Sequence, residues 1–177
     1  MRIIAGRLKG RQFDAPSGHR THPMSEKARG GLFNAMGDIT GLTVLDVFAG
    51  SGALSFEAIS RGAASATAIE IDKRAITTIV KGVASLGLQG RIKAIRANAS
   101  GWSDNNSQVN FDMVFAAPPY DNLQAGLLQK LVRHVKPGGI YVLDWPGHME
   151  APRFDGLKLI KQKNYGDAQL VIYRRIS

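Results

Sequence analysis

The sequence predicts an α/β protein built on a doubly wound, mostly parallel sheet, and two observations carry this prediction. From residue 42 onward, short apolar runs alternate with stretches of helical periodicity, and short loops join them. A glycine-rich turn, residues 48–52, directly follows the first apolar run and leads at once into a helical pattern. Alternation of this kind places helices on both faces of a parallel sheet with right-handed crossovers. The predicted fold class is therefore α/β and Rossmann-like.

The individual elements follow from this periodicity and from the turn residues between them. Five buried strands are predicted at 43–48, 66–71, 91–97, 110–116 and 139–144, with helices at 52–62, 73–86 and 122–135. The segment 136–139, Lys-Pro-Gly-Gly, is predicted as a turn before the fifth strand. Two more strand-like runs, 156–163 and 168–175, suit a C-terminal antiparallel hairpin on the edge of the sheet.

Residues 1–40 are predicted to form a small N-terminal extension packed on a main domain, residues 41–177, as a single structural unit. Two short strands within 2–16 make a β-hairpin around the Lys9-Gly10 turn. Ser25 begins a helix over 26–36, although the Gly30-Gly31 pair disfavours helix within it.

Composition excludes several classes of protein. No apolar run approaches the ~20 residues of a membrane helix, and the N-terminus lacks the pattern of a secretory signal. The 177 residues contain no cysteine, so disulfides and cysteine-ligated metals are excluded. His19 and His22 have no second pair of ligands, and no metal is predicted. We expect a cytoplasmic monomer without membrane contact.

The net charge of +9 is concentrated at the two ends of the chain. Residues 1–29 hold seven basic and two acidic side chains, and residues 152–177 hold six and two. Residues 30–151 hold ten of each. A basic surface at one or both ends attracts a polyanion such as nucleic acid. Solvated tails in a generally basic proteome are the alternative interpretation.

Several marked residues fall where predicted strands end, which is where open α/β sheets bind ligands. An acid at Glu70, twenty residues after Gly50, suits the two hydroxyls of a ribose, and Asn98 suits an adenine edge. Position 55 is serine where a dinucleotide fingerprint has its third glycine, which disfavours NAD. Simple loop geometry is the alternative for the glycines, but the register of Asp46 and Glu70 favours a nucleoside-bearing cofactor. The candidate cofactor-binding residues are Asp46, Phe48, Gly50, Gly52, Glu70, Ile71, Asn98 and Ala99.

The segment Pro118-Pro119-Tyr120 follows the fourth predicted strand and is the more specific signal. Two prolines end the strand and fix a rigid turn. A tyrosine on that turn presents a flat ring on which a base can stack. The alternative is a plain loop in which Tyr120 covers the core.

Together, residues 46–53 (Asp-Val-Phe-Ala-Gly-Ser-Gly-Ala) and 117–120 (Ala-Pro-Pro-Tyr) resemble the class I S-adenosylmethionine methyltransferases that act on exocyclic amines. Nearly end to end, the chain resembles the RsmD family. That resemblance rests on residues 1–11, 20–29, 32–34, 57–62 and 165–167.

The RsmD resemblance implies guanine-N2 methylation of 16S ribosomal RNA, with S-adenosylmethionine as cofactor. Ala117, Pro118, Pro119 and Tyr120 occupy the catalytic segment. A solvated helix face is the alternative for any single basic residue near the N-terminus, but as a group these residues favour RNA contact. They are Arg2, Arg7, Lys9, Arg11, Arg20, Lys27 and Arg29.

The sequence departs from the family at Ala117, where the family has Asp or Asn as an acceptor for the target amine. Another carboxylate, such as Asp121 or Asp144, replaces it, or the enzyme is slow, or the chain binds cofactor and RNA without turnover. An adenine-N6 DNA methyltransferase is a third function compatible with Pro-Pro-Tyr. The lack of a separate target-recognition domain argues against it.

Overall fold

The computed structural model describes residues 1–18 and 23–176. The predictions at His19, Arg20 and His22 lie outside these residues. The strands are β1 (Thr43–Val47), β2 (Ser65–Glu70), β3 (Ile92–Arg96), β4 (Phe111–Ala116), β5 (Val135–Pro146), β6 (Leu157–Tyr165) and β7 (Ala168–Arg175). The helices are α1 (Glu26–Met36), α2 (Ala53–Ser60), α3 (Lys73–Ser85), α4 (Ala99–Asn105) and α5 (Ala125–Lys130), with a 3₁₀ turn η1 (Leu131–His134).

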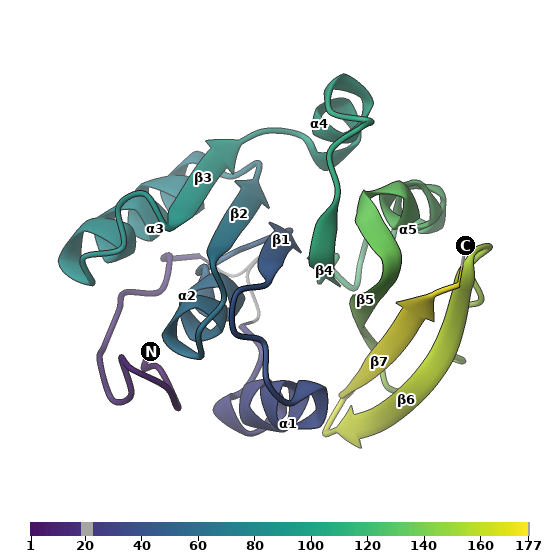
Figure 1. The fold of residues 1–177 in the computed structure, drawn as a ribbon, viewed down its shortest axis with the longest axis horizontal. Helices are drawn as coiled ribbons and strands as arrows, with labels where there is room; N and C mark the ends of the chain where they lie inside the picture. Colours follow the sequence, from purple (N-terminus) through teal and green to yellow (C-terminus); the bar gives the residue numbers. More distant parts are fainter. Residues whose placement is uncertain (19–22, 177) are drawn as a thin grey trace.

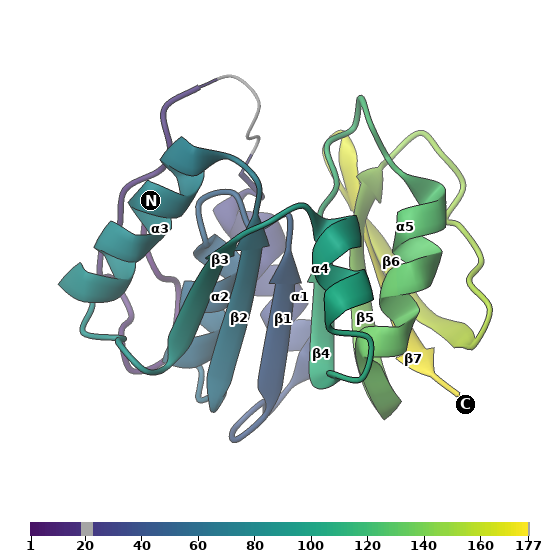
Figure 2. The same cartoon turned by 90° about the horizontal axis from the view of Figure 1, so that it is seen from above.

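The described strands form one seven-stranded sheet in the order β3-β2-β1-β4-β5-β7-β6 (Figure 1). Neighbours from β3 to β5 are parallel, whereas β7 pairs antiparallel with both β5 and β6. The carboxyl ends of the parallel strands therefore meet at one edge of the sheet (Figure 2). The predicted α/β class with a C-terminal antiparallel hairpin is confirmed.

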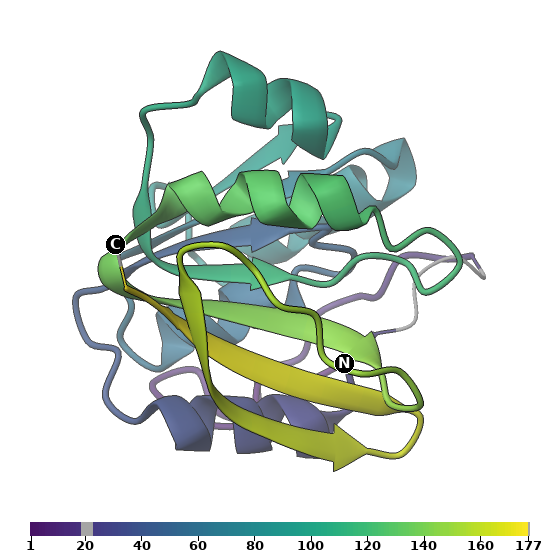
Figure 3. The same cartoon turned by 90° about the vertical axis from the view of Figure 1, so that its right-hand side faces the viewer.

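Two apolar cores lie on opposite faces of this sheet. Phe33 of α1, Phe56 of α2 and Ile79 of α3 belong to one core, and Trp102 of α4 and Leu128 of α5 belong to the other. Figure 3 shows α4 and α5 on one side of the strands and α1 on the other. Within the described ranges, no helix is both long and apolar enough to cross a membrane.

Helix α4 is absent from the sequence prediction. Its first turn is held by Asn98, whose Oδ1 accepts from the backbone N–H groups of Ser100 (3.0 Å) and Gly101 (3.2 Å). Glycine and asparagine are poor helix formers in a helix interior. The capping bonds and the packing of Trp102 on the core therefore stabilise a helix that periodicity alone does not indicate.

The predicted helix 122–135 and the predicted turn 136–139 are both wrong in extent. The α-helix covers only Ala125–Lys130, and β5 already begins at Val135. Phe111 of β4 pairs with Val135 and Met113 with Ile140, so the extra residues of β5 form an irregularity in the ladder. A strand tolerates proline and glycine at such a bulge because no regular ladder bond is required there.

The predicted N-terminal hairpin is reduced to a single antiparallel bridge between Arg2 and Gln12. The turn between these residues packs on the end of α2, where Arg7 N donates to Ser60 O at 2.8 Å. Gly6 has φ +85°, and a Cβ on it would lie 2.0 Å from the same oxygen. Contact with α2 therefore helps to set the path of this segment, together with its own backbone bonds, such as Ile3 N to Arg11 O (2.9 Å) and Phe13 N to Met1 O (3.0 Å).

A fully buried carboxylate, Glu57 of α2, attaches the N-terminal residues to the main domain. It accepts from Ile4 N (2.9 Å), Ala5 N (3.1 Å) and Arg61 Nε (2.8 Å). Its second cationic neighbour is Arg29 of α1, with Nε 3.4 Å from Oε1 and no exposed side-chain surface. Glu57 thus joins the first residues of the chain, α1 and α2 through one charged centre.

Substituting Glu57→Gln is expected to lower the free energy of unfolding by about 3–5 kcal/mol, because it leaves the buried Arg29 charge without its counter-ion. Urea unfolding monitored by circular dichroism measures this loss. Glu26→Gln is the matched control, because it removes the exposed Arg2–Glu26 pair and should leave the unfolding midpoint essentially unchanged. Equal midpoints for the two variants would contradict this role of Glu57.

Candidate functional site at the carboxyl edge of the sheet

The glycine turn after β1 is bonded directly to the end of β2. Glu70 Oε2 accepts from Gly50 N at 2.8 Å, and Glu70 Oε1 accepts from Ile71 N (2.9 Å) and Asp72 N (3.0 Å). An ionised carboxylate has about four acceptor sites. These three described donors leave about one of them for a ligand. The structure thus brings Gly50 and Glu70 together as predicted, but with less room for two ribose hydroxyls than the sequence suggested.

The turn has an unusual backbone. Phe48 has φ 62°, which is rare for a bulky residue and strained. Gly50 (φ 56°) and Gly52 (φ 79°) share this left-handed region. At Gly52 a Cβ would lie 3.1 Å from Ile79 Cγ1, so helix packing also requires this glycine. Strain of this kind is typical of turns shaped for a ligand.

Asp46 lies beneath the turn and not on its surface. Its side chain is 1% exposed, and Oδ2 accepts from Ser55 Oγ at 2.7 Å. Burial raises the pKa of Asp46 to about 7, while the bond from Ser55 opposes the shift. The predicted direct contact between Asp46 and a cofactor is therefore unsupported by this geometry. Asp46 instead joins β1 to the first turn of α2.

Ile71 and Asn98 flank the turn at the ends of the next two strands. Ile71 is 61% exposed immediately after Glu70, which is unusual for an isoleucine beside a buried strand. Asn98 is exposed, but its Oδ1 already caps α4, and Ala99 is buried beneath it. The Asn98 side chain therefore has its amide nitrogen, not its carbonyl oxygen, to offer an adenine edge.

Tyr120 is fixed at the end of β4 by hydrogen bonds to the neighbouring strand. Its hydroxyl donates to Asp144 Oδ1 at 2.5 Å and approaches Trp145 O at 3.2 Å. The residue is 44% exposed, so part of its ring is open to a ligand. Pro118 is buried and Pro119 is exposed, as in a rigid turn that projects from the sheet.

Asp144 was only one of two carboxylates considered from the sequence, and the structure distinguishes it. Ala116 pairs with Leu143 in the parallel register of β4 and β5, so the next positions along are Ala117 and Asp144. Neighbouring parallel strands lie about 4.8 Å apart, and residues in register point to the same face. Burial raises the pKa of Asp144, and the bond from Tyr120 partly offsets this. In the sequence, Asp144 was marked only by being an acidic residue at the end of an apolar run.

One of the described basic residues predicted to contact RNA is buried, and the others are exposed. Arg29 is fully buried and donates to Arg2 O at 2.6 Å, so its predicted RNA contact is corrected to a structural role. Arg7, Lys9, Arg11 and Lys27 are exposed. Arg11 donates to Ser85 O at the end of α3. Because α2 has eight residues, the Arg7 turn at its C-terminus lies about 12 Å from the glycine turn.

The mostly parallel seven-stranded sheet with its C-terminal antiparallel hairpin defines the class as Rossmann-like, and it matches the fold of solved structures named as methyltransferases. The chain belongs to the family described as Conserved hypothetical protein 95, whose model matches residues 1–174, and this is the RsmD family. Both the predicted family and the predicted fold class are thereby confirmed.

Individual relatives match along most of the chain. YlbH of Bacillus subtilis, provisionally named an rRNA methyltransferase, is 30% identical over 182 residues and covers 99% of both chains. Ribosomal RNA small subunit methyltransferase D of Escherichia coli is 34% identical over 140 residues, covering 78% of this chain and 68% of the relative. The solved structure of yhhF from Escherichia coli, provisionally named a methyltransferase, has a TM-score of 0.89 at 29% identity. It covers 99% of this chain and 98% of that one.

The buried Asp46 predicts a specific dependence of stability on pH. Its pKa rises from 3.8 to about 7 on folding, so the folded state binds a proton that the unfolded state releases. The stability contributed by that proton is present below about pH 4 and is lost as the pH rises toward 7. Asp46→Asn keeps an acceptor for Ser55 and should remove this loss, which is at most about 4 kcal/mol.

Urea unfolding of the wild type and of Asp46→Asn from pH 4 to pH 8 measures the effect. The difference in unfolding free energy between the two proteins should shift toward the variant as the pH rises. A difference that stays constant with pH would show that Asp46 is not protonated in the folded state.

Proposed function

We propose that this protein transfers a methyl group from S-adenosylmethionine to the exocyclic N2 amine of a guanine in small-subunit ribosomal RNA. The observation that carries the proposal is the meeting, at one sheet edge, of the Gly50–Glu70 turn and the Tyr120–Asp144 pair. The names of the relatives support the reaction class and the ribosomal substrate. The choice of guanine N2 as the methylated atom goes beyond what those names say and is part of this proposal.

The residues beside the glycine turn fit the nucleoside half of the cofactor. Glu70 offers its remaining acceptor site to a ribose hydroxyl, and the exposed Ile71 offers an apolar surface to the adenine ring. The strained backbone at Phe48, Gly50 and Gly52 shapes the turn that would hold the cofactor. Asn98 and Ala99 border this turn. Asp46 supports it indirectly, through its bond to Ser55 of α2. When bound, S-adenosylmethionine supplies a methyl group already activated by its sulfonium.

The chain's own contribution to the reaction is alignment of the target amine. The lone pair of guanine N2 is delocalised into the ring, so acceptors for its N–H groups make it a better nucleophile. The carbonyls of Ala117 and Pro118 are backbone acceptors on the turn, and Tyr120 offers a ring for stacking. Asp144, one residue beyond the Ala116–Leu143 pair, offers the carboxylate that position 117 lacks. The target base must leave its stack to reach this turn.

Incubation with labelled S-adenosylmethionine and either naked ribosomal RNA or 30S subunits tests the proposal. Label recovered as N2-methylguanine is the expected result. Ala117 favours one competing function, cofactor and RNA binding without catalysis, which predicts bound cofactor but no label in either substrate. Label in adenine of added duplex DNA would instead identify a DNA methyltransferase.

Glu70→Ala is expected to weaken binding of S-adenosylhomocysteine by tenfold or more, roughly the value of one to two charge-assisted hydrogen bonds. Isothermal titration calorimetry measures the affinity. Asp72→Ala removes a neighbouring carboxylate that caps α3 and does not touch Gly50, so its affinity should stay close to that of the wild type. Equal losses in both variants would assign the effect to net charge.

Asp144→Asn should lower the single-turnover rate of methyl transfer by about 10²-fold, the lower range for a positioned acid–base partner. Ala117→Asp should raise the rate of the wild type, because it restores an acceptor on the turn itself. Affinity for S-adenosylhomocysteine should not change in either variant. Rates that stay at the wild-type value in both would reject any role for a side-chain acceptor here.

A further inference from the structure

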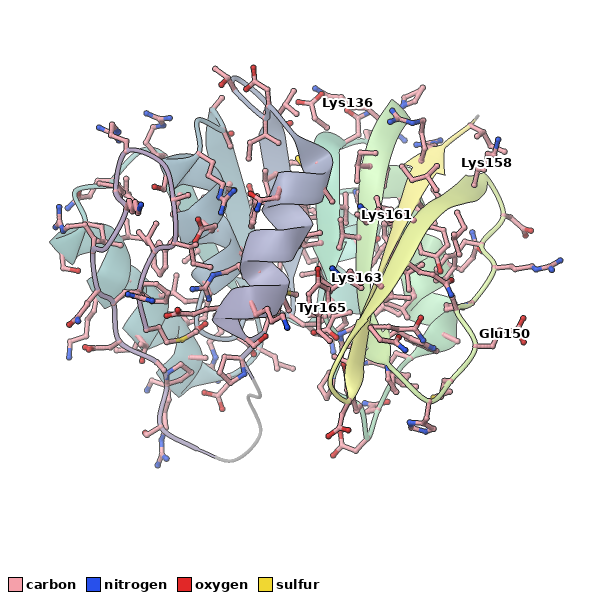
Figure 4. All side chains as sticks on the ribbon, turned by 90° about the horizontal axis from the view of Figure 1, so that it is seen from below. Lys136, Glu150, Lys158, Lys161, Lys163 and Tyr165 are labelled. Atoms are coloured by element: carbon pink, nitrogen blue, oxygen red, sulfur yellow. The ribbon has the colours of Figure 1, made fainter. Side chains whose placement is uncertain are left out.

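A basic groove lies between α1 and the edge strand β6, on the face of the sheet opposite α4 and α5. The groove is open to solvent and has a volume of about 340 Å³. Leu32 of α1 and Leu170 and Ile172 of β7 contribute apolar lining, and Lys161 and Lys163 of β6 contribute charge. Figure 4 shows Lys161, Lys163 and Tyr165 following one another along β6 beside α1.

The charge of this groove is uncompensated. Lys161, Lys163 and Tyr165 alternate along the strand and therefore share one face. Both lysines are exposed, and among the described residues no carboxylate lies within 4.0 Å of either ammonium. None of the residues that line the cavity is acidic. The groove therefore presents two cations without a described carboxylate partner over an apolar floor.

The Tyr165 end of the groove lies near the sheet edge that holds the proposed catalytic residues. Tyr165 begins the β6–β7 turn, and Asp167 O in that turn accepts from Gly147 N at 2.7 Å. Gly147 follows β5 two residues after Trp145, whose carbonyl contacts the Tyr120 hydroxyl. A strand of RNA lying in the groove would thus run toward Tyr120.

Tyr165 closes this end of the groove by packing on α1. A Cβ at Gly31 would lie 2.1 Å from the Tyr165 hydroxyl, so glycine is required for this approach. Lys163 Nζ lies 5.3 Å from the centre of the Tyr165 ring, a distance that suits a cation–π contact. The ammonium therefore lies beside the ring at the end of the groove.

We propose that the α1–β6 groove binds the phosphodiester backbone of the RNA substrate through Lys161 and Lys163 and directs the strand to the Tyr120 turn. This inference rests on the proposed function, because RNA is taken as the substrate. The Tyr165 end of the groove lies near the same sheet edge as the site, whereas the Arg7 turn lies at the other end of α2. Lys161 and Lys163 belong to the basic C-terminal stretch, residues 152–177, and this proposal gives these two charges an RNA-binding role.

Protection of an edge strand is the competing explanation for these lysines. Charged side chains on an edge strand prevent pairing with a second sheet, and β6 is the outermost strand. That explanation predicts self-association when the lysines are removed, with unchanged affinity for RNA.

The test compares two double variants with the wild type. Lys161→Ala/Lys163→Ala removes the groove charges. Lys81→Ala/Lys93→Ala removes two exposed charges from α3 and β3, near the opposite edge of the sheet. Fluorescence anisotropy measures the affinity for a 16S ribosomal RNA fragment at several salt concentrations, and sedimentation measures self-association.

The groove variant should bind RNA about tenfold more weakly at 100 mM salt, with the salt slope reduced by about 1.4 for two single-strand phosphate contacts. The control variant should retain most of the affinity, and both should bind S-adenosylhomocysteine as the wild type does. Equal losses in the two variants, or unchanged RNA affinity in the groove variant, would overturn the proposal. Failure of the wild type to bind RNA would instead remove the proposed function on which it rests.

Discussion

Three backbone N–H groups converge on the carboxylate of Glu70, and the arrangement of the candidate site depends on this convergence. Two of the bonds fix the start of the loop into α3, and the third reaches across to Gly50 after β1. The strained turn at Phe48 is held between this contact and the buried Asp46–Ser55 bond below it. The surface offered to a nucleoside is therefore organised before a ligand arrives, which lowers the entropic cost of binding.

A second charged centre, around Glu57, positions the elements on the other side of the site. It fixes the first residues of the chain and Arg29 of α1 against α2. Phe33 of α1 then packs edge-on against Phe115 of β4, with ring centroids 5.8 Å apart. The place of α1 beside β6, and so the shape of the basic groove, follows from these contacts. A carboxylate in α2 thus influences a surface that it does not touch.

Periodicity predicted the alternation of strands and helices well, because buried parallel strands and amphipathic helices have distinct local patterns. It failed where tertiary contacts decide the outcome. Helix α4 depends on a cap and on Trp102, and the start of β5 depends on a bulge opposite β4. The N-terminal strands form only one bridge, because part of the segment bonds to Ser60 while the rest bonds to itself.

The sequence predicted where the candidate site residues lie along the chain, at strand ends. It did not predict where their side chains point. Strand ends located Gly50 and Glu70 correctly, since parallel strands end at a common edge. Composition suggested that Arg29 faces solvent, yet its partner Glu57 lies 28 residues away in the sequence and only the fold brings them together. Asp46 points to Ser55 for the same reason. The position of Asp144 one residue beyond the Ala116–Leu143 pair required the register of β4 and β5, which no single sequence reveals.

The most direct measurement is a crystal structure of the protein with S-adenosylhomocysteine. The proposed site predicts electron density for the adenosyl group over Ile71, with a ribose hydroxyl on Glu70 and the sulfur directed toward the Tyr120 turn. Density in the α1–β6 groove or elsewhere, with the glycine turn unaltered and empty, would contradict it.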